Sequence, residues 1–170
     1  MSASALRVGV SGHRALADPA AVAHDVDLVI DRLLPDHDGG VIVSVSSLAE
    51  GADRIVAARV LARAGGRLEV ILPLAVDDYI MDFADDSSRR EFHDLLASAE
   101  HCQVAPADPA DSSREAAYAR AGTAVLDACD VLLALWDGGP ARGRGGTAEV
   151  VAVARKRGRP VEIVSVRRSG

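Results

Sequence analysis

Aromatic residues are scarce in this 170-residue chain, at 3% of the sequence, so a hydrophobic core must be built from Val, Leu, Ile and Ala. There are only two cysteines, Cys102 and Cys129, and they lie far apart without metal-ligand spacing to histidine. We therefore expect no disulfide framework, no metal site and no resident cofactor. A reducing compartment, the cytoplasm, fits this cysteine usage.

Excess basic charge and long apolar runs are also lacking. The chain has 19 Lys and Arg against 25 Asp and Glu, a net charge of −6. Gripping nucleic acid requires a concentrated excess of basic side chains, so we expect no nucleic-acid partner. No run approaches the roughly 18 apolar residues that span a bilayer, and the N-terminus lacks a signal-peptide pattern, so we expect no membrane partner.

The chain does contain short runs rich in Val and Ile, which are typical of strands buried on both faces. They lie at 6–10, 41–45, 68–72, 131–136 and 161–166, with a weaker run at 102–105. Helical patterns alternate with them, at 19–33, 52–64, 88–99, 113–128 and 148–156. This alternation predicts a single α/β domain over 1–170, with one doubly wound, mostly parallel Rossmann-like sheet and helices on both faces.

Local signals mark several helix ends. Asp18, followed by proline, indicates an N-cap, while Pro35 and the pair Gly39-Gly40 indicate the end of that helix. Ser88 stands three residues before a glutamate, the spacing of a capping box. Two stretches, 73–87 and 105–112, are too irregular to be simple connections, and loops of that length usually carry function or disorder.

The most informative stretch is the glycine turn at 142–149, between the fifth strand and the last helix. Glycines let the backbone approach a ligand closely, Thr147 can cap the helix, and the free N–H groups of the first turn carry about half a positive charge. The segment therefore predicts an anion site. The alternative is a tight strand-to-helix turn without a ligand.

Ligands of open parallel sheets bind beyond the carboxyl ends of the strands, and polar or glycine-rich segments follow several strands of this chain. Serine and a guanidinium fork beside a glycine suit a phosphate. We predict that the ligand-binding residues are Ser11, Gly12, His13, Arg14, Gly51, Asp53, Gly138, Gly145, Gly146 and Thr147.

Each of these residues also has a structural interpretation. His13 is then a turn residue bonded to backbone, and Arg14 faces solvent. Asp53 and Glu149 each lie in the first turn of a predicted helix, where negative charge is favourable by a few tenths to about 1 kcal/mol regardless of function. Trp136, at the end of an apolar strand, has packing as its ordinary role.

The segments 8–14, 48–54, 72–73, 130–138 and 145–151, taken in order, resemble the SLOG superfamily. This superfamily includes Lonely Guy phosphoribohydrolases, the Rossmann-like domain of DNA-processing proteins and nucleotide-sensing domains. The resemblance implies a nucleotide or nucleotide-derived ligand across the two glycine loops. Lonely Guy hydrolases, however, carry their catalytic glutamate at the position of Val150, whereas this chain has Glu149, about 100° away around a helix. Their Arg-Lys pair aligns with Arg120 and Ala121, so the lysine is missing.

Three hypotheses follow. The first is a cytoplasmic sensor-type domain that binds a nucleotide-type small molecule, with a homo-oligomeric state and an effector protein as further expectations. The second is an N-glycosidase acting on a nucleoside monophosphate, with Glu149 or Glu50 stabilising the sugar cation and Arg120 on the phosphate. The third is a subunit whose crevice is vestigial.

Overall fold

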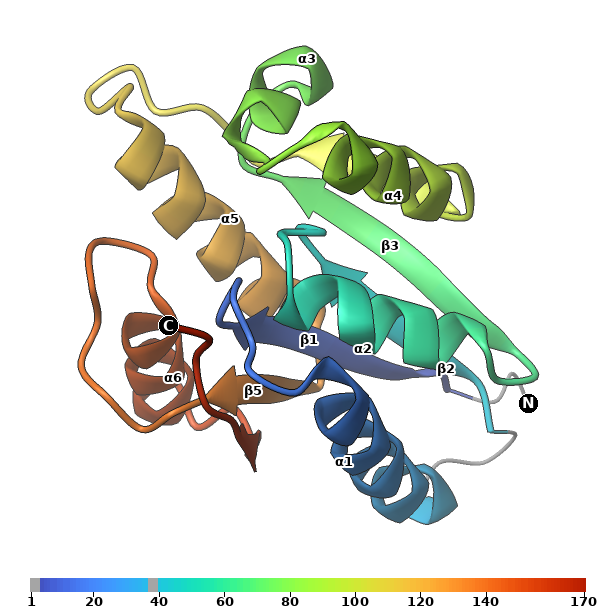
Figure 1. Ribbon diagram of the computed structural model, residues 1–170. Helices are drawn as coiled ribbons and strands as arrows, with labels where there is room; N and C mark the ends of the chain where they lie inside the picture. The colour runs from blue at the N-terminus through green and yellow to red at the C-terminus, as the bar shows by residue number, and fades with distance from the viewer. Residues whose placement is uncertain (1–3, 37–39) are drawn as a thin grey trace.

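The computed structural model describes residues 4–36 and 40–170, so Gly39 of the predicted helix stop lies outside the described residues. One sheet of six parallel strands, in the order β4-β3-β2-β1-β5-β6, forms the centre of the domain (Figure 1). The fold is the predicted α/β Rossmann-like arrangement. The strands are β1 (Leu6–Gly12), β2 (Ile42–Ser46), β3 (Gly66–Leu72), β4 (His101–Val104), β5 (Val131–Trp136) and β6 (Val161–Ser165).

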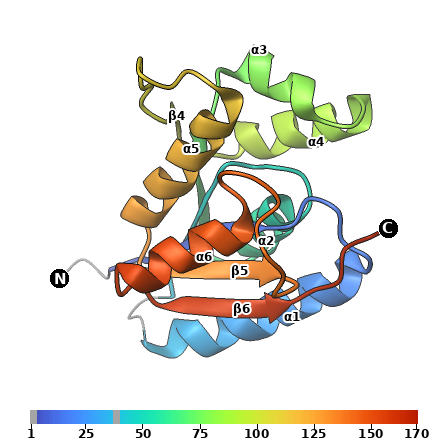
Figure 2. The same ribbon diagram turned by 90° about the vertical axis from the view of Figure 1, so that its left-hand side faces the viewer.

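Helices cover both faces of the sheet. Apolar residues of α1 and α2 pack on one face and those of α5 and α6 on the other, as Figure 2 shows for α6 in front of β5 and β6. No helix in the described part of the chain has the length and apolar character needed to cross a bilayer. The helices are α1 (Pro19–Leu33), α2 (Ala52–Leu61), α3 (Val76–Tyr79), α4 (Asp86–Ala97), α5 (Arg114–Ala128) and α6 (Thr147–Lys156), with short 3₁₀ turns η1 (Leu34–Asp36) and η2 (Ile80–Asp82).

Of the predicted helix caps, Asp18 is confirmed and two are wrong. The Asp18 side chain accepts from the Ala21 N–H, and Ser113, which was not predicted as a cap, accepts in the same way from the Ala116 N–H. For α4, Asp85 is the cap, because its carboxylate accepts from the Ser88 N–H at 2.8 Å. For α6, the extended residue before the helix is Gly146, so Thr147 is the first helical residue and not the cap.

The irregular stretch 73–87 contains the short helices α3 and η2, which the sequence did not indicate. They are held by aromatic packing, since the Tyr79 ring contacts Phe83 and Phe92 at centroid distances of 4.9 and 5.8 Å. Ion pairs from Arg114 of α5 to Asp78 and Asp82 tie this segment to the opposite layer. The segment therefore forms a fixed wall above β3.

The order of the strands reverses between β1 and β5, the neighbours from which the chain builds outward in both directions. Gly12, the last residue of β1, lies at this point against the start of α2. A Cβ atom on Gly12 would lie 2.3 Å from the Cβ of Ala52 and 2.9 Å from the carbonyl oxygen of Leu135. Any side chain here would push α2 or β5 away.

We expect Gly12→Ala to lower the free energy of unfolding by about 1–3 kcal/mol, the typical cost of overpacking a close-packed interior. Urea unfolding measures the change. Gly122→Ala on α5 is the control, because its Cβ would meet only one methyl group of Val150, at 3.3 Å, and we expect it to stay within about 1 kcal/mol of the parent. Equal effects of the two substitutions would contradict the crowding at Gly12.

Candidate functional site

A cavity of about 420 Å³ opens at the reversal point, beyond the carboxyl ends of β1 and β5. We call it the switch-point cavity. It is lined by the loop after β1, the loop before α6, the start of α2, Tyr79 of α3 and one side of α5. Its size is typical of small-molecule sites, and parallel sheets place ligands at this position. Eight predicted ligand-binding residues line it: Ser11, Gly12, His13, Arg14, Asp53, Gly145, Gly146 and Thr147.

Hydrogen bonds fix the loop after β1. The His13 N–H donates to the Leu135 carbonyl at 3.2 Å, and the His13 Nε2 accepts from the Asp137 N–H at 3.1 Å. The pKa of Asp137 is lowered to about 2, chiefly by the hydrogen bond from the Gly139 N–H. Gly51, with a φ of +77°, approaches this loop so closely that a Cβ would lie 2.3 Å from the Arg14 carbonyl oxygen. His13 thus joins two loops, as expected of a turn residue.

The glycine turn before α6 forms the opposite rim. Gly145 has a φ of +75° and packs on α5, where a Cβ would lie 3.0 Å from the Ala119 nitrogen. This geometry brings Gly146, Thr147 and Ala148 to the cavity. The first N–H groups of a helix have no partners within the helix, so this rim presents donors and the positive end of the α6 dipole.

Arginines dominate the charge of the cavity lining. Arg144 is paired with Asp111 at 2.6 Å, and Arg168 with Asp137 at 2.8 Å. Arg14 and Arg142 have no ion pair among residues 4–36 and 40–170. The lining holds four arginines and a single carboxylate, so the cavity attracts anions. Arg142 and Arg144 belong to the glycine turn at 142–149, whereas nothing in the sequence indicated Arg168. Arg168 lies near the end of the chain and forms an isolated antiparallel β-bridge with Leu16.

The single carboxylate in the lining is Asp53, at the start of α2, and it is 6% exposed. Its Oδ2 accepts from the Ala49 N–H at 3.1 Å. Burial raises the pKa of Asp53 to about 6, although this bond and the nearby Arg14 and Arg54 act in the opposite direction. The hydrogen bond and the two arginines therefore offset only part of the cost of burying the Asp53 carboxylate.

This pKa predicts a pH-dependent cost to stability. Between about pH 4 and pH 6 the unfolded chain ionises at residue 53 while the folded protein keeps the proton, so the parent loses stability as the pH rises. Asp53→Asn removes this loss while keeping an acceptor for Ala49. We expect the variant to gain up to about 3 kcal/mol over the parent from pH 4 to 6.5 in urea unfolding. A constant difference over that range would contradict the raised pKa.

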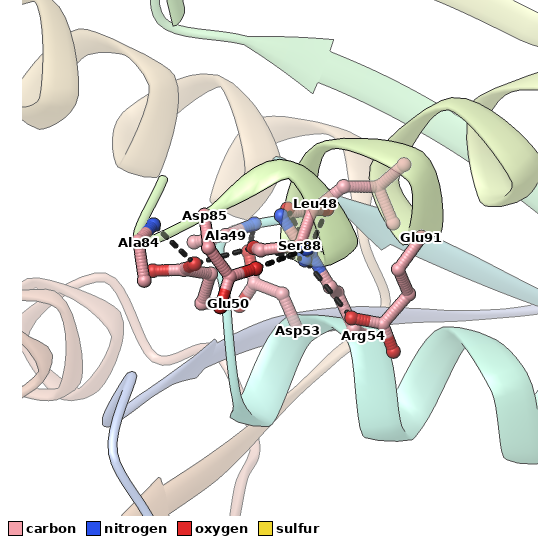
Figure 3. A network of polar contacts seen from close by, with 9 residues as sticks. All are labelled: Leu48, Ala49, Glu50, Asp53, Arg54, Ala84, Asp85, Ser88 and Glu91. Carbon is pink, nitrogen blue, oxygen red and sulfur yellow. Dashed lines mark hydrogen bonds and ion pairs between the residues drawn. The ribbon is translucent and has the colours of Figure 1, made fainter. Parts of the chain in front are cut away.

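Glu50, a candidate for sugar-cation stabilisation, lies outside the cavity lining and belongs to a structural network (Figure 3). Its carboxylate accepts from the Ala84 N–H at 2.8 Å and from the Ser88 hydroxyl. The neighbouring Arg54 is 3% exposed and donates to the Leu48 carbonyl, Ser88 and Glu91 at 2.8–3.1 Å. Together these bonds attach the loop after β2 to α4.

We expect Arg54→Ala to destabilise the protein by at least about 2 kcal/mol, because it leaves buried carbonyl groups without donors. Arg59→Ala on the same helix is the matched control. Arg59 is 40% exposed and pairs with Asp27, so we expect a loss of at most about 1 kcal/mol. Thermal and urea unfolding measure both, and a loss for Arg54→Ala no larger than for the control would show that the network is not structural.

The remaining predicted residues also lie outside the cavity lining. The Glu149 carboxylate folds back to accept from the Gly145 N–H at 2.8 Å, in the first turn of α6. Arg120 donates to the Asp111 carbonyl at 2.9 Å and lines a separate groove on α5. Gly138 has a φ of +79° in the loop after β5. The structure therefore does not bring Glu149, Glu50 and Arg120 together.

Comparison with known proteins identifies the fold. No family model and no curated protein matches the chain. The Moco carrier protein from Chlamydomonas reinhardtii is similar in structure, with a TM-score of 0.51 and 20% identity over 95% of this chain and 76% of that chain. A second structure of that protein gives a TM-score of 0.44 at 18% identity, with the same coverage. At this identity the likeness shows the shared Rossmann-like fold. Among the described residues no group of His, Cys, Asp and Glu is arranged to hold a metal ion.

Proposed function

We propose that this protein binds a nucleotide or nucleotide-derived small molecule in the switch-point cavity, with its phosphate between the loop after β1 and the start of α6. The observation that carries the proposal is the lining itself: four arginines, one carboxylate and the N-terminus of a helix around about 420 Å³. A phosphate gains from the arginines and from the helix N-terminus, since guanidinium forks, N–H donors and the helix dipole each favour a compact anion.

Two further considerations support this proposal. The motif order resembles the SLOG superfamily, whose members bind nucleotides, and we propose that the chain is a divergent member. The structural neighbour is, by its name, a carrier of the small molecule Moco, which supports a ligand-holding role for this fold. The expectations of a homo-oligomer, an effector partner and a cytoplasmic location stay predictions.

The geometry favours binding over hydrolysis of an N-glycosidic bond. A carboxylate that stabilises a sugar cation must face the bound ligand, but Glu149 is bonded to Gly145, and Glu50 is bonded to Ala84 and Ser88. Neither lines the cavity. We therefore propose a binding domain and assign these glutamates structural contacts. A vestigial crevice would not require the unpaired Arg14 at its rim.

Arg14→Ala tests the proposal. The guanidinium lies over the Tyr118 ring, 5.2 Å from its centroid, and makes no ion pair with a carboxylate of the described residues. Removing a charge-assisted hydrogen bond to phosphate should lower affinity about tenfold or more. Isothermal titration calorimetry with AMP, GMP, ADP-ribose, cyclic nucleotides and inorganic pyrophosphate measures the effect.

Arg90→Ala is the control for the loss of one positive charge. Arg90 is exposed on α4 and does not line the cavity, so its affinity for each compound should match that of the parent. If no phosphorylated compound binds the parent, or if Arg14→Ala and Arg90→Ala bind equally well, the proposed function is wrong.

A further inference from the structure

The inner wall of the switch-point cavity carries a buried hydroxyl without a partner. Tyr79 of α3 lines the cavity and is 0% exposed. Its hydroxyl has no hydrogen-bond partner in the part of the chain that the structure describes. Buried polar groups in native proteins are almost always bonded, so an unpaired phenol at the wall of a ligand-sized cavity calls for an occupant of that cavity.

The other tyrosine of the chain differs, because its hydroxyl has a partner within the protein. Tyr118 of α5 also lines the cavity, with its ring 6.0 Å from that of Tyr79. Its hydroxyl donates to the Asp82 carboxylate, which is itself paired with Arg114 at 2.9 Å. The Tyr118 hydroxyl thus has a partner within the protein, whereas the Tyr79 hydroxyl remains available to a ligand.

Acceptor capacity lies next to the free hydroxyl. Asp53 lines the same wall, and its negative charge contributes, after burial, to raising the pKa of Tyr79 well above its ordinary value. A carboxylate offers about four lone-pair positions, and the Ala49 N–H and the Ser46 side chain take two of them. Tyr79 and Asp53, which line the same cavity, therefore present one donor and remaining acceptors to an occupant.

The surrounding charges define what can bind there. An anionic group would face Asp53, and a cationic group would face Arg14, whose charge acts on both Asp53 and Tyr79. A neutral group that both donates and accepts hydrogen bonds meets neither repulsion. Hydroxyl groups of a sugar and the amino group of a heterocycle have this chemistry.

We propose that Tyr79 and Asp53 form a second subsite, which recognises a neutral hydroxyl or amino group of the ligand whose phosphate lies at the α6 rim. This inference rests on the proposed function and adds a specificity determinant to it. Phosphate held by the arginines gives affinity for any phosphorylated compound. The subsite then selects among such compounds, since a buried polar group left unpaired rejects a ligand that lacks the matching group.

Tyr79→Phe separates this role from packing, because it keeps the ring and removes only the hydroxyl. Calorimetry should show about tenfold weaker binding of the tightest of AMP, GMP and ADP-ribose, and pyrophosphate affinity within twofold of the parent. Ribose 5-phosphate distinguishes the sources: a Tyr79-dependent affinity for it assigns the sugar hydroxyls, and its absence assigns the heterocycle.

Thermal unfolding without ligand gives a second readout. Removing an unsatisfied buried hydroxyl should leave the Tm of Tyr79→Phe no lower than that of the parent, with a rise of about 2–4 °C expected. Tyr118→Phe is the matched control, and its Tm should fall because its hydroxyl is bonded to Asp82.

The subsite is refuted if Tyr79→Phe binds the nucleotides as tightly as the parent, if the parent binds them no more tightly than pyrophosphate, or if the Tm of Tyr79→Phe falls. In each of these cases, binding of pyrophosphate to the parent and its loss in Arg14→Ala would leave the phosphate site intact. Absence of binding of both pyrophosphate and nucleotides to the parent would instead contradict the proposed function.

Discussion

The close approach of α2 to the end of β1 is the constraint on which the site depends. Gly12 has no Cβ, so Ala52 and Leu135 pack directly on its backbone, and the loop after β1 turns sharply over the sheet edge. Gly51, the residue before α2, is equally crowded, because a Cβ there would meet the carbonyl groups of His13 and Arg14. These two close approaches determine the position of Arg14 at the cavity rim.

Much of the fold could be predicted from the sequence, because buried parallel strands and their helices have strong periodic patterns. Five strands lie at clear apolar runs and β4 at the weaker run, and the cap at Asp18 is the one indicated. Helix ends that depend on a choice between neighbours were less predictable. Asp85 caps α4, and the Ser88 hydroxyl instead donates to Glu50, a residue distant in sequence.

The location of the candidate site could be predicted from the sequence, but the directions in which its side chains point could not. Glycine loops after parallel strands indicated the correct sheet edge, and Arg14 and Asp53 do line the cavity. No local pattern shows that Glu149 folds back onto Gly145, because that contact depends on the turn geometry. Tyr79 stood out only as one of few aromatics, and its free hydroxyl results from tertiary packing.

The helical segment between β3 and β4 and the rim before α6 are held in place by different kinds of contact. Its contacts with the rest of the protein include side-chain pairs, such as Arg114 with Asp78, whereas the rim before α6 is built from glycine backbone. A single substitution can remove a side-chain contact, but the glycine positions of the rim do not tolerate substitution. The part of the cavity wall that carries Tyr79 is therefore open to change by single substitutions, whereas the rim before α6 is constrained by its backbone.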